Sequence, residues 1–176
     1  MKDPQEIQAF LKLNRLRAEG RRYAVSLLEE GKSALEILQE IETANNAAHA
    51  FIPENQMDFY PEKEIENCNR QNIRCLVFTD PDYPFLLKTI PDPPLLLYMK
   101  GYITESDQKA IAIVGTRHPS FYGRMQAQRF AGALASKGLT IVSGLARGID
   151  QIAHESAIQV PYGRTLAVMG CGLDVV

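Results

Sequence analysis

The chain has 176 residues, of which 45% are hydrophobic and 23% charged, which excludes a wholly disordered protein and is typical of a soluble globular one. Its length suits one ordinary domain, or a small domain followed by part of a larger one. No apolar run approaches the roughly 20 residues that span a bilayer, and the N-terminus opens no secretory signal, so we expect a cytoplasmic protein without a membrane partner.

The net charge of −2 is unevenly distributed along the chain. Residues 1–60 and 61–105 are both acidic, whereas residues 106–176 carry seven basic and four acidic side chains. This positive surplus is compatible with a polyanionic ligand of the last segment. It is too small to indicate nucleic acid by itself.

Cysteine and histidine are too scattered for a disulfide framework or a zinc site. The cysteines stand at positions 68, 75 and 171, and the histidines at 49, 118 and 154. We therefore expect free thiols, with Cys75 buried in a strand, and no metal ion.

The N-terminal residues have the apolar spacing of helices. Residues 4–17 are predicted to form the first helix, with Asp3 as its N-cap and Gly20 as its break. Residues 23–30 are predicted to form a second helix that Gly31 ends.

A third helix is predicted from a capping-box pattern, in which Ser33 is followed three residues later by Glu36. Residues 43–60 are polar and irregular, which favours a connection. We therefore expect residues 1–60 to form a small all-α domain and its linker.

The middle of the chain mixes short elements with prolines. Residues 62–69 are predicted to be helical, and the apolar, β-prone residues 73–78 to form a buried strand. Five prolines in residues 79–101 exclude one regular element there, although residues 95–99 are predicted to form a strand.

From about residue 109 the pattern alternates between strand and helix. Each apolar strand ends in glycine, or in serine and then glycine, and successive units are about 30 residues long, as βα units are. This predicts an α/β fold with a Rossmann-like parallel sheet over residues 61–176, incomplete at the C-terminus. The predicted strands are residues 110–114, 140–142 and 165–169, and the predicted helices are residues 121–137 and 149–158.

Three loops are predicted to meet at one edge of this sheet, because right-handed crossovers give the three strands one direction. They are residues 115–119, 143–148 and 170–172. Ligands of open α/β sheets bind at that edge. The helix that begins near Gly148 is expected to point its first free N–H groups into the same space.

The residue types in these loops favour phosphate. Glycine lets an anion approach the backbone, serine adds a hydroxyl donor and arginine adds a forked cation. The candidate phosphate-binding residues are Gly115, Thr116, Arg117, Ser143, Gly144 and Gly148, and the weaker candidates are Arg124, Arg147, Phe121 and Tyr122. The alternative is that these glycines serve only tight turns. Asp150, in the first helical turn, is interpreted as a capping residue.

Known cofactor and catalytic motifs are not found. The sequence contains neither G-x-G-x-x-G after the first strand nor a P-loop, so no nucleotide cofactor is expected. A triad of Cys171, His154 and Asp150 is disfavoured, because the last two lie four residues apart on one helix and can simply pair. We therefore expect no catalytic residues.

Three long segments, in order, resemble the DNA-processing protein A (DprA, or Smf) family. They are "AIVGTRHPSFYG", "GLTIVSGLARGIDQIAHESAI" and "GRTLAVMGCGLDVV", and residues 81–101 are similar to the segment that precedes the core of that family. The resemblance covers roughly residues 80–176.

The resemblance implies a non-enzymatic protein that binds single-stranded DNA, protects incoming DNA in natural transformation and loads RecA recombinase. It also implies a homodimer, and a Rossmann-like domain preceded by a sterile-alpha-motif-like (SAM-like) helical domain. By the same resemblance, Arg117, Ser143, Gly144 and Gly148 line the DNA-phosphate pocket. Later strands of the family, which complete the sheet and add DNA and dimer contacts, are expected beyond Val176, so binding by these residues alone is expected to be weak or absent.

Two other functions remain open from the sequence. One is a Rossmann-like hydrolase or transferase of small nucleotides, for which Asp150 and Asp174 are the available carboxylates near the pocket. The other is an interaction module that docks a partner through its N-terminal helices.

Overall fold

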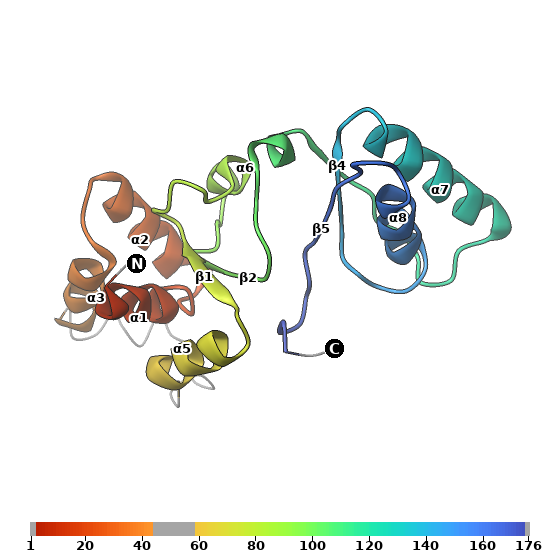
Figure 1. The fold of residues 1–176 in the computed structure, drawn as a ribbon. Helices are drawn as coiled ribbons and strands as arrows, with labels where there is room; N and C mark the ends of the chain where they lie inside the picture. Colours follow the sequence, from red (N-terminus) through yellow and green to blue (C-terminus); the bar gives the residue numbers. More distant parts are fainter. Residues whose placement is uncertain (1–2, 44–58, 175–176) are drawn as a thin grey trace. The chain divides into compact units, whose positions relative to one another are not determined.

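The chain consists of two compact units, which are described here one at a time (Figure 1). The structure, a computed structural model, describes residues 3–43 and 59–174. The two units are Met1–Gly101 and Tyr102–Val176. This division lies further along the chain than the expected domain boundary after residue 60.

Most helices of the first unit begin close to where the sequence predicts them, but the second begins at residue 18 and not at residue 23. These helices are α1 (Pro4–Leu13), α2 (Ala18–Glu29), α3 (Ala34–Thr43) and α5 (Pro61–Arg70). Asp3 caps α1 as predicted, since its carboxylate accepts the N–H of Gln5 at 3.0 Å. Gly31, with φ of 93°, lies just beyond the end of α2, also as predicted.

The prediction that Gly20 breaks a helix is wrong. Gly20 lies buried in the first turn of α2, and the preceding helix has already ended at Leu13. A glycine inside a helix costs only about 1 kcal/mol relative to alanine. Burial of the apolar face of α2, through Ala24, Leu27 and Leu28, is large enough to offset that cost.

The predicted capping box at the start of α3 is confirmed. The carboxylate of Glu36 accepts the N–H of Ser33 at 2.8 Å, and the hydroxyl of Ser33 accepts the N–H of Glu36 at 3.2 Å. A second cap comes from α1, because Glu6 accepts the N–H groups of Ala34 at 2.7 Å and Leu35 at 3.3 Å. The predicted connection over residues 43–60 falls mostly on residues 44–58, which lie outside the described residues.

A two-stranded antiparallel sheet completes the first unit. Strand β1 (Arg74–Val77) pairs with β2 (Leu96–Met99), close to the predicted strands, and the short helix α6 (Phe85–Lys88) lies between them in the chain. Asn14, just after α1, accepts the N–H groups of Leu95 at 2.7 Å and Leu96 at 3.3 Å. The sheet therefore belongs with the N-terminal helices, which is why the units do not divide after residue 60.

The core of the first unit joins the helices to this sheet. Cys68 on α5 is buried, whereas Cys75 on β1 is only half-buried, and burial raises the pKa of the Cys75 thiol to about 12. The largest fully buried side chains of the first unit are Phe10, Leu11, Leu13, Leu16, Ile37, Leu76, Val77 and Leu95.

The second unit has the predicted alternation of strands and helices. A short 3₁₀ helix (Glu105–Gln108) comes first. The elements that follow are β3 (Ala110–Ala112), α7 (Phe121–Ala135), β4 (Thr140–Ser143), α8 (Ile149–Ile158) and β5 (Thr165–Ala167). The strands are parallel in the order β3-β4-β5, so their carboxyl ends share one edge, as predicted.

Both crossover helices pack on the same face of the sheet (Figure 1). Small side chains allow this close packing: the core between α7, α8 and β4 consists of Ala131, Ala135, Ile141, Ala153 and Ala157. The prediction that Cys171 is a free thiol agrees with its exposed position in the loop after β5.

A partly buried ion pair links the start of the second unit to the residue before β5. The carboxylate of Asp107 accepts two hydrogen bonds from the guanidinium of Arg164, from Nε at 2.5 Å and from Nη2 at 2.6 Å. It also accepts the hydroxyl of Thr140 and the N–H of Thr104, each at 2.8 Å. Burial by itself would raise the pKa of Asp107. The hydrogen bonds to its carboxylate outweigh that effect and lower the pKa to about 2.

Candidate functional site

The loops after β3 and β4 meet at the carboxyl edge of the sheet. Gly148, at the start of α8, has φ of 88°, and a Cβ on it would lie 2.4 Å from the carbonyl oxygen of Thr116. That same oxygen accepts the N–H of Ile149 at 3.2 Å. Gly148 is therefore required for the two loops to approach each other.

The first N–H groups of α8 were expected to be free donors, but most of them are hydrogen-bonded to the protein's own backbone. The N–H of Ile149 bonds to Thr116, and the N–H of Gln151 donates to the carbonyl oxygen of Ala146 at 3.0 Å. The helix start therefore fastens the two loops together and offers fewer donors to a ligand than predicted.

Asp150 has a different role from the helix-capping role interpreted from the sequence. Its side chain is buried, and its two carboxylate oxygens accept the N–H groups of Gly115 at 3.3 Å and Gly144 at 3.2 Å. These donors come from different loops. The amides of Gly115 and Gly144, predicted to bind phosphate, are thus bonded to a carboxylate of the chain itself.

Ser143 is also committed to the fold. It is only 2% exposed, and its hydroxyl donates to the carbonyl oxygen of Ile113 at 2.6 Å, across to the neighbouring strand. A hydroxyl in that position stabilises the pairing of β3 and β4. It is not presented to a ligand, in contrast to the role predicted for it.

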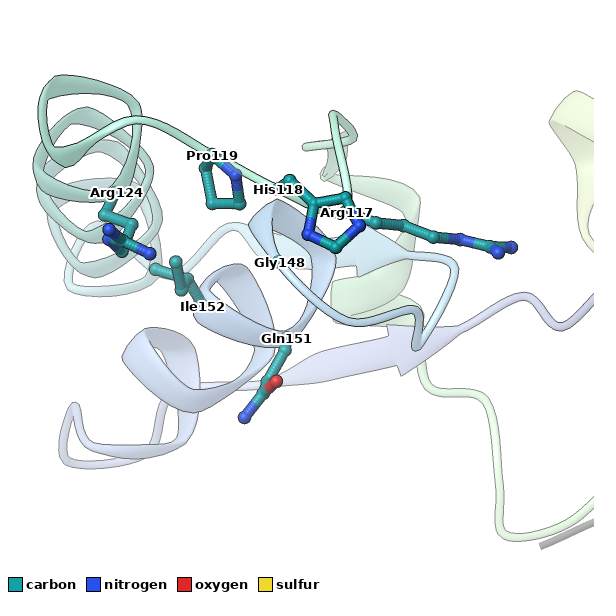
Figure 2. Close-up of a pocket in the computed structure, with 7 residues that line it drawn as sticks. All are labelled: Arg117, His118, Pro119, Arg124, Gly148, Gln151 and Ile152. Atoms are coloured by element: carbon teal, nitrogen blue, oxygen red, sulfur yellow. The ribbon is translucent and has the colours of Figure 1, made fainter.

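A pocket of about 390 Å³ lies beside these loops (Figure 2). Its two cations are Arg117, from the loop after β3, and Arg124, from the second turn of α7, which lie on opposite sides of the pocket in Figure 2. The lining residues are Arg117, His118, Pro119, Arg124, Gly148, Gln151 and Ile152. The structure thus brings together two predicted residues, Arg117 and Gly148, and one weaker candidate, Arg124.

His118 and Gln151 are pocket residues that sequence reasoning missed. His118 directly follows Arg117, and Gln151 comes one turn after Gly148 on α8, so both follow from the predicted loops once α8 is placed. Thr116 does not line the pocket, but its hydroxyl accepts the N–H of His118 at 3.1 Å and so shapes the loop that carries Arg117.

The remaining weaker candidates lie near the pocket without lining it. Phe121 and Tyr122, in the first turn of α7, are 74% and 72% exposed, and Arg147 is exposed in the loop before α8. Exposed aromatic side chains are groups on which the bases of single-stranded nucleic acid can stack.

The disfavoured triad is not assembled. Cys171 is exposed in the loop after β5, whereas His154 is buried on α8 with its Nδ1 2.7 Å from the hydroxyl oxygen of Thr165. Because that hydroxyl donates to the carbonyl oxygen of Ile141, it accepts its bond from Nδ1–H of His154. Among residues 3–43 and 59–174 no cluster of His, Cys, Asp or Glu fits a metal ion.

Comparison with known proteins decides the family. Residues 74–176 match the family model described as DNA recombination-mediator protein A, and this segment holds the pocket and all three parallel strands. The chain belongs to the DNA recombination-mediator protein A family. The resemblance read from the sequence motifs is thereby confirmed.

Relatives in this family match most of the chain. The protein Smf of Synechocystis is 39% identical over 155 residues, which are 85% of this chain and 39% of the relative. The DNA processing protein DprA of Bacillus subtilis is 36% identical over 141 residues, which are 78% of this chain and 47% of the relative. The chain therefore spans less than half the length of these curated relatives.

A solved structure of a relative supports the fold. The X-ray structure of DNA processing protein A from Streptococcus pneumoniae matches 100% of this chain and 61% of its own, with a TM-score of 0.64 and 28% sequence identity. In the part of the chain that the structure describes, no helix has the length and apolar character needed to cross a membrane.

Proposed function

We propose that this chain is the phosphate-binding part of a single-stranded DNA-binding protein, which protects incoming DNA and loads RecA recombinase in natural transformation. The observation that carries this proposal is the pocket at the carboxyl edge of the sheet, which is lined by both Arg117 and Arg124; in Figure 2 they lie at opposite sides of it, with the Arg117 guanidinium extending outward. Two separated guanidinium groups suit the phosphates of an extended backbone.

Single-stranded DNA fits this surface better than a duplex groove does. The two arginines of the pocket can bind backbone phosphates whatever bases are attached, which favours binding independent of sequence. Phe121 and Tyr122 stand exposed on the same helix as Arg124, where bases next to a bound phosphate can stack on them. Arg147 adds a further exposed cation in the neighbouring loop.

The contacts described above support the following proposed roles for the loop residues. Arg117 is the main phosphate ligand, Arg124 the second, and Thr116 and Gly148 hold the loop that presents Arg117. Gly115, Gly144 and Ser143 do not contact the DNA in this proposal. They stabilise the loops by donating hydrogen bonds within the protein.

Other properties come to this proposal from the family resemblance. They are a non-enzymatic role, a cytoplasmic location, RecA as partner and a homodimer of the full-length protein. The helices α1, α2 and α3 are proposed to be the SAM-like domain. Because the chain spans 39% and 47% of two relatives, these properties are assigned to the full-length protein.

The test is binding of a fluorescent oligothymidine by the full-length protein at several salt concentrations. Arg117→Ala is expected to weaken binding about tenfold or more and to reduce the salt dependence by about one released counterion. Arg124→Ala should have a smaller effect of the same kind. Arg129→Ala, an exposed arginine of α7 that does not line the pocket, is the matched control. An Arg117→Ala affinity within twofold of wild type, with the protein folded, would remove Arg117 from the site.

A further inference from the structure

In this structure the amides best placed to bind an anion are already bonded. At the carboxyl edge of a parallel sheet, backbone N–H groups of the strand-end loops and of the following helix form an anion-binding cradle. Here two of them, the N–H groups of Gly115 and Gly144, donate to the carboxylate of Asp150. We call these two amides the edge cradle.

The fit between Asp150 and the edge cradle is close. Each carboxylate oxygen accepts one amide, and a Cβ on Gly144 would lie 2.8 Å from Oδ2 of Asp150. Asp150 as a whole is only 7% exposed. Asp150 stands in the first turn of α8, where the helix dipole favours a negative charge. The carboxylate therefore holds the place that a ligand's phosphate oxygens would take.

The two arginines lie outside this cradle. Arg117 and Arg124 line the pocket together with Gly148, Gln151 and Ile152, whereas Gly115, Gly144 and Asp150 do not. The site thus has an inner part, filled by the chain's own anion, and an outer part, with two cations open to a ligand.

We propose that Asp150 is a specificity-determining residue that excludes phosphate monoesters from the sheet edge and confines binding to phosphodiesters at the outer arginines. This inference rests on the proposed function. A monoester carries close to two negative charges at neutral pH, so binding at the edge cradle would place it against a buried carboxylate. A phosphodiester carries one charge and needs only the outer cations, so the carboxylate does not exclude it.

The test measures phosphate binding at the amides themselves. Isotope-labelled full-length protein is titrated with inorganic phosphate and with adenosine monophosphate, and the amide resonances of Gly115 and Gly144 are followed. In wild type these resonances are expected to stay unchanged while phosphate reaches several millimolar. In Asp150→Ala they should shift saturably, with phosphate affinity at least tenfold tighter than in wild type.

Two further variants keep the test decisive. Asp150→Asn preserves the shape but offers only one acceptor oxygen, so it should show a smaller gain, and it replaces Asp150→Ala if that variant does not fold. Asp174→Asn, which changes an exposed carboxylate after β5, should behave as wild type. Saturable phosphate shifts at both glycines in wild type, or none in a folded Asp150 variant, would each overturn the inference.

The oligothymidine measurement separates this inference from the proposed function. If the Gly115 and Gly144 resonances stay unchanged with phosphate in wild type and shift in Asp150→Ala, but wild type fails to bind oligothymidine, the proposed function fails and the edge-cradle assignment survives. If it binds oligothymidine while monoesters enter the edge cradle of wild type, only the role of Asp150 is wrong.

Discussion

The carboxylate of Asp107 and the guanidinium of Arg164 form a two-bond ion pair across 57 residues of the chain, and the Asp107 side chain is only 4% exposed. The pair joins a residue three positions before the first parallel strand to the residue directly before the last. Its position makes the second unit sensitive to acid.

The first prediction concerns this acid sensitivity. The folded-state pKa of Asp107 is lowered to about 2 from its ordinary value of 3.8, so its stabilisation is fully present above about pH 4 and is lost as pH falls toward 2. The lowering corresponds to about 2 kcal/mol. Urea unfolding between pH 2 and 6 should show this loss, and Asp107→Asn should lack it. An Asp107→Asn protein with the pH profile of wild type would contradict the assignment.

Two glycine substitutions should have opposite effects on stability. Gly148→Ala places a Cβ 2.4 Å from a backbone oxygen at φ of 88°, and should cost several kcal/mol or prevent folding. Gly132→Ala, in the interior of α7 with no atom within 4 Å of the new Cβ, should stabilise by about 1 kcal/mol. Thermal unfolding of both variants measures the contrast. A stable Gly148→Ala protein would show that the loops meet differently.

His154 gives a prediction near neutral pH. Burial lowers the pKa of its imidazole below 6.5, although the negative charge of Asp150 acts in the opposite direction. The unfolded chain therefore binds a proton more readily than the folded one, and stability should fall as pH drops below about 6.5. Nuclear magnetic resonance titration of His154 measures the pKa directly. His118→Gln, which replaces an exposed histidine, is the control, and a His154 pKa above 6.5 would reverse the prediction.

The aromatic side chains at the start of α7 should contribute to DNA affinity. Replacing Tyr122 by alanine in the full-length protein should weaken oligothymidine binding by about 1 kcal/mol or more, because stacking of one base is lost. Tyr162→Ala is the matched control, since Tyr162 is fully exposed in the turn before β5 and does not line the pocket. Equal affinities for the two variants would exclude stacking on Tyr122.

Local sequence patterns predicted most of the second unit. The helix at Ile149–Ile158 was predicted with its exact bounds, because Gly148 marks its start and an apolar strand precedes it. Strands β3 and β5 are shorter than predicted, although the N–H of Ile113 still bonds to Val142 at 2.9 Å and that of Val168 to Ser143 at 2.8 Å.

Roles that depend on distant partners were not predictable in the same way. Ser143 donates to a carbonyl 30 residues earlier in the chain, and Asp150 accepts an amide 35 residues earlier. The residue types show that Ser143 can donate and Asp150 can accept a hydrogen bond. Which partner each one reaches depends on the register of the sheet. The prediction that Gly20 breaks a helix was wrong for a related reason, because its burial against other helices is not visible in the local sequence.

The cap that Glu6 supplies to α3 has a consequence for how the N-terminal unit unfolds. The amides of Ala34 and Leu35 depend for their hydrogen bonds on a residue of α1, not only on their own helix. Fraying of α1 therefore removes one of the two N-terminal caps of α3, so we expect the two helices to open as one cooperative unit. Their amide protons should exchange with solvent at a common free energy of opening, although the sequence presents them as separate helices.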